Sequence, residues 1–316
     1  MKLKYILKIL TAICIIILFT MCDDSPFDAP EDEFAIIIAE NCTEVNNELF
    51  HTGESLNQIQ SPPLEEISGI AASINNPGYY WVHNDSGNAP NLFLLDSIGN
   101  LVATFRVTSG NRDWEDIACV KNPKDGKSYI YIGDFGDNLA IRPNIKVIEI
   151  EEPKVVTFGS LEIIELQHKR DIFFTYPDGA KDAESLIVDP ISMDLFIISK
   201  RDGFSRVFTS NYPYSDEINE LVHVATLPFN TATAADISSD GKEILVRTYI
   251  KVYYWQRNGT EHLKYTFQRN PLCLPLIPEP QGEAICFDFR NSGYYTTSEV
   301  QGYESLNVTL NYYREK

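Results

Sequence analysis

The chain has 316 residues, 44% of them hydrophobic and 12% aromatic, and its formal net charge at pH 7 is −19. This length is sufficient for one large domain with a buried core. The acidic balance argues against a nucleic-acid-binding role, because such proteins need clustered Lys and Arg.

The first segment, Met1 to Met21, has the pattern of an export signal. It contains three lysines and no acid, and its apolar run from Ile9 to Phe19 is too short for a comfortable membrane span. Cys22 follows that run and begins an acidic, Pro-containing tether that we predict to end at residue 33. The pattern resembles a lipoprotein signal peptide, with Cys22 as the lipidated first residue of the mature chain. An uncleaved signal anchor is the alternative.

Acidic residues directly after a lipidated Cys resemble the surface-export signal of Bacteroidetes lipoproteins. We therefore expect a lipoprotein of the outer membrane or cell surface, with a periplasm-facing anchor as the alternative. Membrane contact is expected through the lipid alone, and the protein is expected to be a monomer.

The remaining residues, 34–316, are predicted to form one all-β domain. Its clearest unit is Asn111 to Asn138, in which two short runs rich in Ile, Val and Tyr flank an Asn-Pro-Lys-Asp-Gly turn. This pattern predicts a β-hairpin with an acidic cluster at each end. A hairpin brings the start of its first strand and the end of its second strand to one edge.

The same unit recurs at intervals of about 50 residues, which is typical of propeller blades. Five copies are visible, and they begin near Glu66, Asn111, Asp182, Ala234 and Gly282. A third apolar run usually follows each hairpin. The interval between the second and third copies is longer than the others, so a degenerate sixth blade is an alternative to five.

An extended segment from Glu48 to Gln60 precedes the first unit. If it pairs with the last unit, it closes the ring without a free edge. Two segments interrupt the repeat. The stretch from Glu151 to Lys169 is interpreted as an outer strand or a flap, and Asn270 to Gln281, which carries several prolines, as a loop.

Four cysteines follow Cys22. Cys119 and Cys286 lie in first strands and are expected to be buried thiols. Cys42 and Cys273 lie in irregular segments, where a disulfide is an option in an oxidising compartment. No CxxC pair is present, and the sequence leaves the pairing open.

In a propeller, all first strands begin at the same mouth of the central channel, so carboxylates at those starts converge. Glu115, Glu184 and Glu283 share one register, and Ser68 takes the same position in the first unit. Hard oxygen ligands favour Ca²⁺ or Mg²⁺, so these three glutamates are the predicted metal ligands. Asp236 is expected to align with Asp116. A structural role for the carboxylates, binding backbone N–H groups between blades, is the alternative.

The second-strand ends bring further polar residues to the same mouth, and these are the predicted ligand-binding residues. They are His83, Asn84, Asp85, Asp134, Lys200, Arg201, Arg247 and Glu299. Cations facing an acid-bound metal suit an anionic ligand or a developing oxyanion. For His83 alone, a structural hydrogen-bonding role is favoured over general-base catalysis.

The strings SGIAAS, WVHNDSGN, NRDWEDIA, YIGDFGDN and QGEAICFD, over nearly all of the mature chain, resemble a family of uncharacterised exported bacterial β-propeller proteins. The chain is more distantly similar to phytase-like esterase, SdiA-regulated and gluconolactonase-type propellers. Similarity to the gluconolactonase group implies a divalent metal held by channel carboxylates and hydrolytic activity, and it maps onto Glu115, Glu184 and Glu283.

Two functions follow. The first is a propeller that binds a small molecule, glycan or protein at its acidic mouth, and it is favoured because no nucleophile elbow, zinc-protease helix or phosphate loop is present. The second is a metal-dependent hydrolase of phosphoesters, esters or lactones. A purely structural role is a third option.

Overall fold

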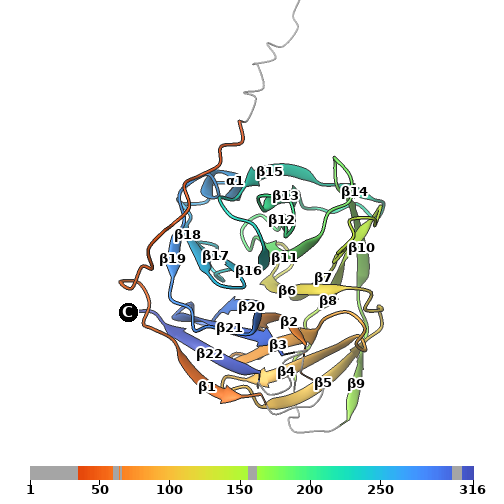
Figure 1. The fold of residues 1–316 in the computed structure, drawn as a ribbon. Coiled ribbons are helices and arrows are strands. Elements are labelled where there is room, and N and C mark those ends of the chain that lie inside the picture. Colours follow the sequence, from red (N-terminus) through yellow and green to blue (C-terminus); the bar gives the residue numbers. More distant parts are fainter. Residues whose placement is uncertain (1–34, 60–63, 65, 156–161, 301–307) are drawn as a thin grey trace, which may run out of the picture. The chain divides into compact units, whose positions relative to one another are not determined.

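A computed structural model of the chain describes residues 35–59, 64, 66–155, 162–300 and 308–316. Within these residues the strands form five sheets arranged as the blades of a single β-propeller (Figure 1). The alternative of a sixth blade is therefore excluded for the described residues. The predicted signal segment, Cys22 and the tether lie outside them. No helix of the described part is long and apolar enough to span a membrane.

Each blade begins with the predicted hairpin, and its sheet then extends outward. Blade 1 consists of β2 (Ile67–Ala72), β3 (Tyr79–Asn84), β4 (Asn91–Asp96), β5 (Leu101–Val107) and β9 (Ile163–Leu166). Blade 2 consists of β6 (Trp114–Lys121), β7 (Ser128–Asp134), β8 (Ile145–Glu151), β10 (Arg170–Thr175) and β14 (Asn219–Glu220).

The other three blades have four strands each. Blade 3 consists of β11 (Ala183–Val188), β12 (Leu195–Ser199), β13 (Arg206–Ser210) and β15 (Val222–Thr226). Blade 4 consists of β16 (Ala232–Ile237), β17 (Glu243–Thr248), β18 (Val252–Gln256) and β19 (Leu272–Leu274), with helix α1 (Leu263–Thr266) before β19. Blade 5 consists of β20 (Gln281–Phe287), β21 (Gly293–Glu299), β22 (Thr309–Arg314) and β1 (Glu54–Gln58).

The long interval between the second and third units does not hold another blade. The described part of the Glu151–Lys169 segment supplies β9, which adds to blade 1 in parallel with β5. The outer strand is thereby confirmed within the described part, and residues 156–161 of the segment lie outside it. The proline-rich Asn270–Gln281 segment contributes the three-residue outer strand β19 and is otherwise irregular.

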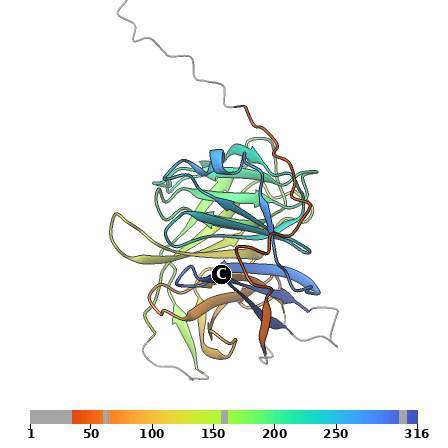
Figure 2. The ribbon, with the colours of Figure 1, turned by 90° about the vertical axis from the view of Figure 1, so that its left-hand side faces the viewer.

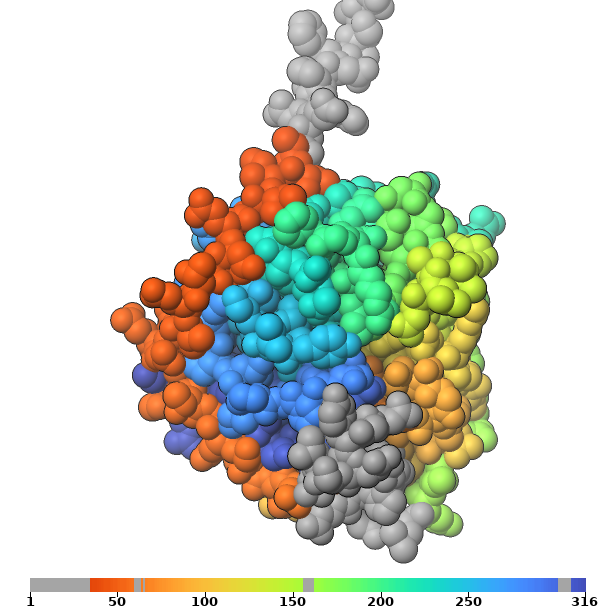
Figure 3. Space-filling view, viewed as in Figure 1, coloured from red at the N-terminus to blue at the C-terminus, as the bar shows by residue number. Residues whose placement is uncertain are grey.

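The ring closes through its N-terminal strand, as predicted. β1 pairs antiparallel with β22, and Figure 2 shows the orange β1 beside the dark-blue C-terminal strand. Upstream of β1, the chain runs along blades 4 and 5, which Figure 3 shows as an orange-red band beside blue. A disulfide between Cys42 and Cys273 fastens this segment to blade 4. Cys42 and Cys273 thus form the disulfide that the sequence left as an option, and Cys273 lies in β19.

The inner strands are apolar on both faces because every blade packs between two others. β7 and β11 are buried along their whole length, whereas the outer strand β10 alternates between buried and exposed side chains. Buried residues form five apolar clusters, one between each pair of adjacent blades. Burial on both faces explains why the repeats read as short continuous apolar runs.

Candidate functional site

Every first strand carries a β-bulge at the same place, next to one mouth of the channel. The register between first and second strand shifts at one residue in each blade, and these residues are Ser68, Glu115, Glu184, Thr233 and Glu283. A bulge inserts an extra residue and re-aims its side chain. The shared register expected for the three glutamates and Ser68 is therefore confirmed, and Thr233 is the fifth member.

The two bulged residues that lack a carboxylate form hydrogen bonds between blades. The Ser68 hydroxyl donates a hydrogen bond to the Glu115 carbonyl at 2.8 Å, and the Thr233 hydroxyl donates to the Gly282 carbonyl at 2.9 Å. Each bond joins one blade to the start of the next. The three glutamates at equivalent positions are free to point their carboxylates elsewhere.

The second strands supply another set of equivalent positions. In each blade, one second-strand residue pairs with the first-strand residue just before the bulge, and the position meant is the next residue along the second strand. These residues are Asp85, Phe135, Lys200, Tyr249 and Glu299. We define the acidic mouth as Asp85, Asp113, Glu115, Glu184, Glu283 and Glu299, together with Lys200. It contains six carboxyl groups and one ammonium group.

The tightest group of carboxylates in the acidic mouth is Asp85, Asp113 and Glu115. Each offers one oxygen, and these oxygens lie within 4.8 Å of one another. The residues come from two adjacent blades, because Asp85 follows β3 while Asp113 and Glu115 flank the start of β6. Gly136 leaves room for them, since a Cβ there would lie 2.6 Å from the Asp113 Cγ and even closer to Glu115 Oε1.

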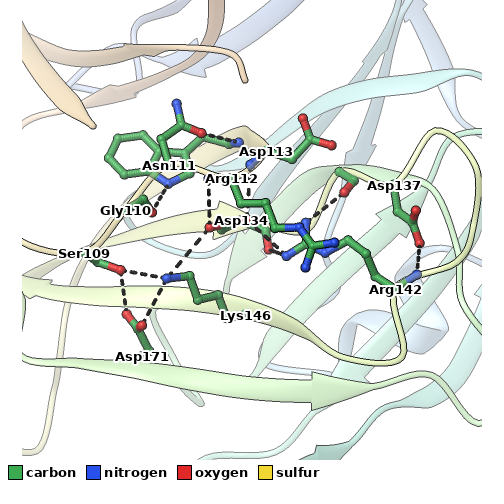
Figure 4. A network of polar contacts seen from close by, with 12 residues as sticks. Ser109, Gly110, Asn111, Arg112, Asp113, Asp134, Asp137, Arg142, Lys146 and Asp171 are labelled. Carbon is green, nitrogen blue, oxygen red and sulfur yellow. Dashed lines mark hydrogen bonds and ion pairs between the residues drawn. The ribbon is translucent and has the colours of Figure 1, made fainter. Parts of the chain in front are cut away.

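The loop that presents Asp113 is held from below by Asp134 (Figure 4). The Asp134 carboxylate accepts hydrogen bonds from the backbone N–H groups of Arg112 at 3.3 Å and Asp113 at 3.2 Å. Arg142 and Lys146 neutralise it, at 3.1 and 3.8 Å. Asp134 is fully buried, and these contacts let it position the loop.

The other predicted metal ligands lie beside a cation. The Lys200 ammonium contacts Glu184 Oε2 and lies 3.8 Å from Glu283 Oε1. The Tyr249 hydroxyl donates a hydrogen bond to Glu283 Oε1 at 3.1 Å. Of the three glutamates predicted to bind metal, Glu115 thus lies in the tight acidic group, while Glu184 and Glu283 face Lys200.

Glu299 completes the mouth on the blade 5 side. Its Oε2 accepts a hydrogen bond from Gln281 Nε2 at 2.5 Å, and the same amide nitrogen donates to Glu283 Oε1 at 3.2 Å. Its Oε1 is buried without a hydrogen-bond partner among the described residues. Only 3% of Glu299 is exposed. A proton or a cation is therefore needed to satisfy that oxygen.

Burial raises the pKa of five carboxyl groups in the acidic mouth. Burial, reinforced by neighbouring carboxylates, raises the pKa of Asp85 to about 6 and the pKa of Glu115 well above its usual range. Burial raises the pKa of Asp113 as well. Burial raises the pKa of Glu184 to about 8, although Lys200 lowers it. Burial together with Glu283 raises the pKa of Glu299 to about 10. A bound cation would reverse these shifts.

Two predicted ligand-binding residues on β3 lie behind the mouth. His83 is fully buried with its ring edge against Trp114, at 5.6 Å between centroids. Burial lowers its pKa to about 4, so the imidazole is neutral at pH 7. The Asn84 side chain is also buried, and its amide nitrogen donates to Asn88 Oδ1 at 3.4 Å.

Arg247 is fully buried between blades 4 and 5. It donates hydrogen bonds to the carbonyls of Ala284 at 2.9 Å and Thr297 at 3.1 Å, and to Glu279 Oε2 at 2.7 Å. Arg201 lies at the rim instead, where it contacts Asn138 and Asp182 and is about half exposed. The structure therefore brings Asp85, Lys200 and Glu299 to the mouth, Arg201 beside it, and Arg247 elsewhere.

Two details depart from the sequence expectations. Asp113 was missed as a candidate ligand, although it lies two residues before Glu115 in the motif NRDWEDIA. The expected alignment of Asp236 with Asp116 is wrong. Asp116 directly follows its bulged residue, whereas Asp236 is three residues beyond Thr233 and pairs with Leu245.

The loops after the second strands carry exposed apolar side chains on the same side as the mouth. We call these residues the apolar rim: Leu139, Ile141, Phe204 and Ile250, with exposed fractions of 77, 69, 47 and 80%. They belong to blades 2, 3 and 4 in turn. Contacts between Asn138 and Arg201, and between Lys200 and the Tyr249 ring at 5.0 Å, link these loops.

Comparison with known proteins identifies no matching family model and no matching curated protein. Solved structures of similar fold include a Dos1 propeller, at 10% identity over 80% of this chain and 69% of that chain, with a TM-score of 0.38. A chain of a nidogen/laminin complex matches at 9% identity over 82% and 90%, with a TM-score of 0.43. An auxiliary nutrient binding protein from Bacteroides thetaiotaomicron matches at 10% identity over 89% and 76%, with a TM-score of 0.45.

Proposed function

We propose that this propeller is a binding protein whose acidic mouth holds a divalent cation, Ca²⁺ or Mg²⁺, and captures a protein or peptide partner there. The observation that carries the proposal is the convergence of Asp85, Asp113 and Glu115, whose oxygens lie within 4.8 Å of one another. Carboxylate oxygens at such spacing suit a hard cation. Desolvated carboxylates repel one another unless a cation or protons neutralise them.

The identity of the cation follows from the donors. All three side chains are carboxylates, and no imidazole or thiol of the described residues joins the group. Oxygen-only ligands favour Ca²⁺ and Mg²⁺ over zinc or copper. Of the two, Ca²⁺ tolerates irregular coordination, and a site assembled from two blades is irregular, so Ca²⁺ is our first choice.

The size and chemistry of the partner follow from the apolar rim. Leu139, Ile141 and Ile250 are the most exposed large apolar side chains of the described chain. Exposed apolar side chains gathered around a polar centre mark interaction surfaces. A partner that places a polar group in the mouth and apolar side chains on the rim matches this arrangement.

We propose that binding takes place at the cell surface, with Cys22 as the lipid anchor. The apolar run ending at Phe19 and the acidic residues after Cys22 support this proposal. Labelling of cells with an alkyne fatty acid should mark the wild-type protein and not C22A. Labelling of both, or of neither, would contradict the anchor.

Thermal unfolding of residues 34–316 tests the cation site. A ligand that binds only the folded state stabilises it by RT ln(1 + [L]/Kd), so Ca²⁺ added after EDTA should raise Tm saturably by several degrees. The shift should vanish in the D113N/E115Q double variant and persist in the control E217Q, which changes an exposed acid far from the mouth. No shift with either Ca²⁺ or Mg²⁺ would contradict the site.

A metal-dependent hydrolase is the second candidate function. The specific observation in its favour is Lys200, whose buried ammonium lies beside Glu184 in the acidic mouth. A cation next to a metal could stabilise an oxyanion. Turnover of p-nitrophenyl phosphate or of a γ-lactone that needs Ca²⁺ and is lost in both E115Q and K200M would favour the enzyme over the binding protein.

A further inference from the structure

A cavity of about 270 Å³ lies at the other end of the first strands. The first strands start at the acidic mouth and run along the channel, and the cavity is lined where they end. All five blades contribute, for example through Ala72, Cys119, Val188, Ile237 and Phe287. The cavity is thus separate from the acidic mouth.

Small side chains in two neighbouring blades make this end hollow. At two equivalent positions of the first strands beside the cavity, blade 1 has Ala71 and Ala72, and blade 2 has Ala118 and Cys119. The corresponding residues of the other blades are larger, as Ile237 and Phe287 show. The volume that four small side chains leave empty is lined mainly by apolar residues, with Ser73, Ser238 and Asn291 among the polar ones. A cavity of this kind accepts a compact apolar group.

The cavity wall also carries an acidic group. Asp236 lines it and is partly exposed to it, and its Oδ2 accepts a hydrogen bond from the Phe287 N–H at 2.7 Å. No Lys or Arg among the described residues forms an ion pair with Asp236. Lys121 lines the cavity as well but is exposed.

A second carboxylate in the wall is already satisfied. Asp288 accepts hydrogen bonds from the N–H groups of Arg290 and Ser292, both at 2.8 Å, and from the hydroxyls of Ser292 and Tyr312 at 2.6 and 2.9 Å. Asp236 keeps free acceptor capacity, because the N–H groups of Phe287 and Ile237 use only part of the about four hydrogen bonds that a carboxylate accepts. A carboxylate without an ionic partner, in a cleft with mainly apolar walls, attracts a cation.

We propose that this cavity is a second binding site, for a small molecule that joins an apolar body to a protonated amine. The apolar body fills the space beside Ala71, Ala72 and Ala118, and the ammonium group donates a hydrogen bond to Asp236. Because the two sites lie at opposite ends of the first strands, this proposal does not depend on the function of the acidic mouth.

Ligand-observed NMR with 2-phenylethylamine tests the site, with 2-phenylethanol and phenylacetate as matched probes, in phosphate buffer to avoid a competing amine. We expect saturable binding of the amine to residues 34–316, weaker binding of the alcohol and the weakest binding of the acid. D236N should weaken amine binding about tenfold and leave alcohol binding nearly unchanged, because only the amine gains a charge-assisted hydrogen bond. Equal binding of amine and acid would overturn the proposal.

Two further measurements locate the bound amine. Cys119 lines the cavity, so the amine should slow modification of its thiol by a small methanethiosulfonate. Ala118→Leu should fill the space and abolish binding, which tests the site even if D236N fails to fold. Loss of amine binding in E115Q, with unchanged binding in A118L, would place the amine at the acidic mouth and overturn the proposal.

Discussion

Adjacent carboxylates on β6 have opposite roles because the bulge turns them to different surroundings. Glu115 is the bulged residue and faces the acidic mouth. Asp116 is fully buried, and its oxygens accept backbone N–H groups of Ile117 at 2.9 Å, Leu186 at 2.8 Å and Ala235 at 3.1 Å. Asp116 thereby connects blades 2, 3 and 4. The structural interpretation of channel carboxylates thus applies to Asp116, whereas the functional one remains our proposal for Glu115.

The two roles predict opposite effects on stability. D116N should lower the free energy of unfolding by about 1–3 kcal/mol, because its NH₂ group would face backbone donors that lose an acceptor. E115Q should be neutral or stabilising in EDTA, because it removes repulsion with Asp85 and Asp113. Urea unfolding of both variants in EDTA measures this. Similar losses in both would show that Glu115 is structural.

Arg247 forms a buried ion pair with Glu279, although the sequence pattern predicts that Arg247 binds a ligand. Removing one partner of such a pair leaves the other charge uncompensated, which costs about 3–5 kcal/mol. We expect R247A to lose stability in this range, and R247M/E279Q to lose less, because the double variant leaves no buried charge. Urea midpoints compare them. A stable R247A with weakened partner binding would instead support a ligand contact.

Asp236 predicts a pH dependence of stability. Burial raises its pKa from 3.8 to about 7, although the N–H groups of Phe287 and Ile237 lower it. The folded state therefore binds this proton more tightly than the unfolded state, and Asp236 destabilises the fold progressively as pH rises from about 4 to about 7. Relative to D236N, the wild type should lose stability over that interval. A constant difference between the two at pH 4, 6 and 8 would contradict the shift.

At the scale of single elements, the β6–β7 hairpin builds most of the proposed cation site. Its first strand supplies Glu115, the loop before it supplies Asp113, and the loop after β7 places Gly136 against both. Asp134, at the end of β7, holds that first loop through two backbone N–H groups. The site is therefore pre-arranged by one hairpin and completed by Asp85 from its neighbour.

Gly136→Ala tests this arrangement. A Cβ at this position would contact Glu115 Oε1 and lie 2.6 Å from the Asp113 Cγ, so both carboxylates must move. We expect Ca²⁺ affinity to fall at least about tenfold, because a displacement of about 1 Å disrupts an assembled site. Isothermal titration measures it. Gly110→Ala is the matched control, since a Cβ there meets nothing within 4 Å. Equal affinities of the two variants would contradict the site.

At the scale of the whole molecule, two N-terminal contacts hold the ring closed. β1 covers the edge of β22, and the chain before it is fixed by the Cys42–Cys273 disulfide, whose partners are 231 residues apart in sequence. The Asn46 N–H also donates to the Cys273 carbonyl at 2.7 Å. A covered edge removes a template for pairing with other chains.

The disulfide should stabilise the closed ring by about 2–5 kcal/mol, since it limits the freedom of the unfolded chain. The C42S/C273S variant should therefore unfold at a lower denaturant concentration and show more aggregation on heating. C119S is the control, because Cys119 is a free thiol. Light scattering during thermal unfolding reports both properties. Equal behaviour of the two variants would show that β1 alone closes the ring.

Local patterns in the sequence determined the fold class, the hairpin repeat and the closing strand. Apolar runs, turn residues and their spacing act over a few neighbouring residues, so Asn111 to Asn138 could be interpreted without its partners. The shared position of Glu115, Glu184 and Glu283 followed from the same repeat. The number of blades did not follow from the repeat, because the apolar runs that form β9 and β10 resemble the strands of another blade.

Only the tertiary structure decided which side chains meet. One bulge per first strand breaks the simple alternation of faces, which is why Asp236 was misaligned and Asp113 overlooked. The orientation of the Arg247 side chain depends on its hydrogen bond to Glu279. The cavity at the end of the channel depends on Ala71 and Ala118, which lie in neighbouring blades. These contacts join residues far apart in the chain, so spacing along the sequence carries no information about them.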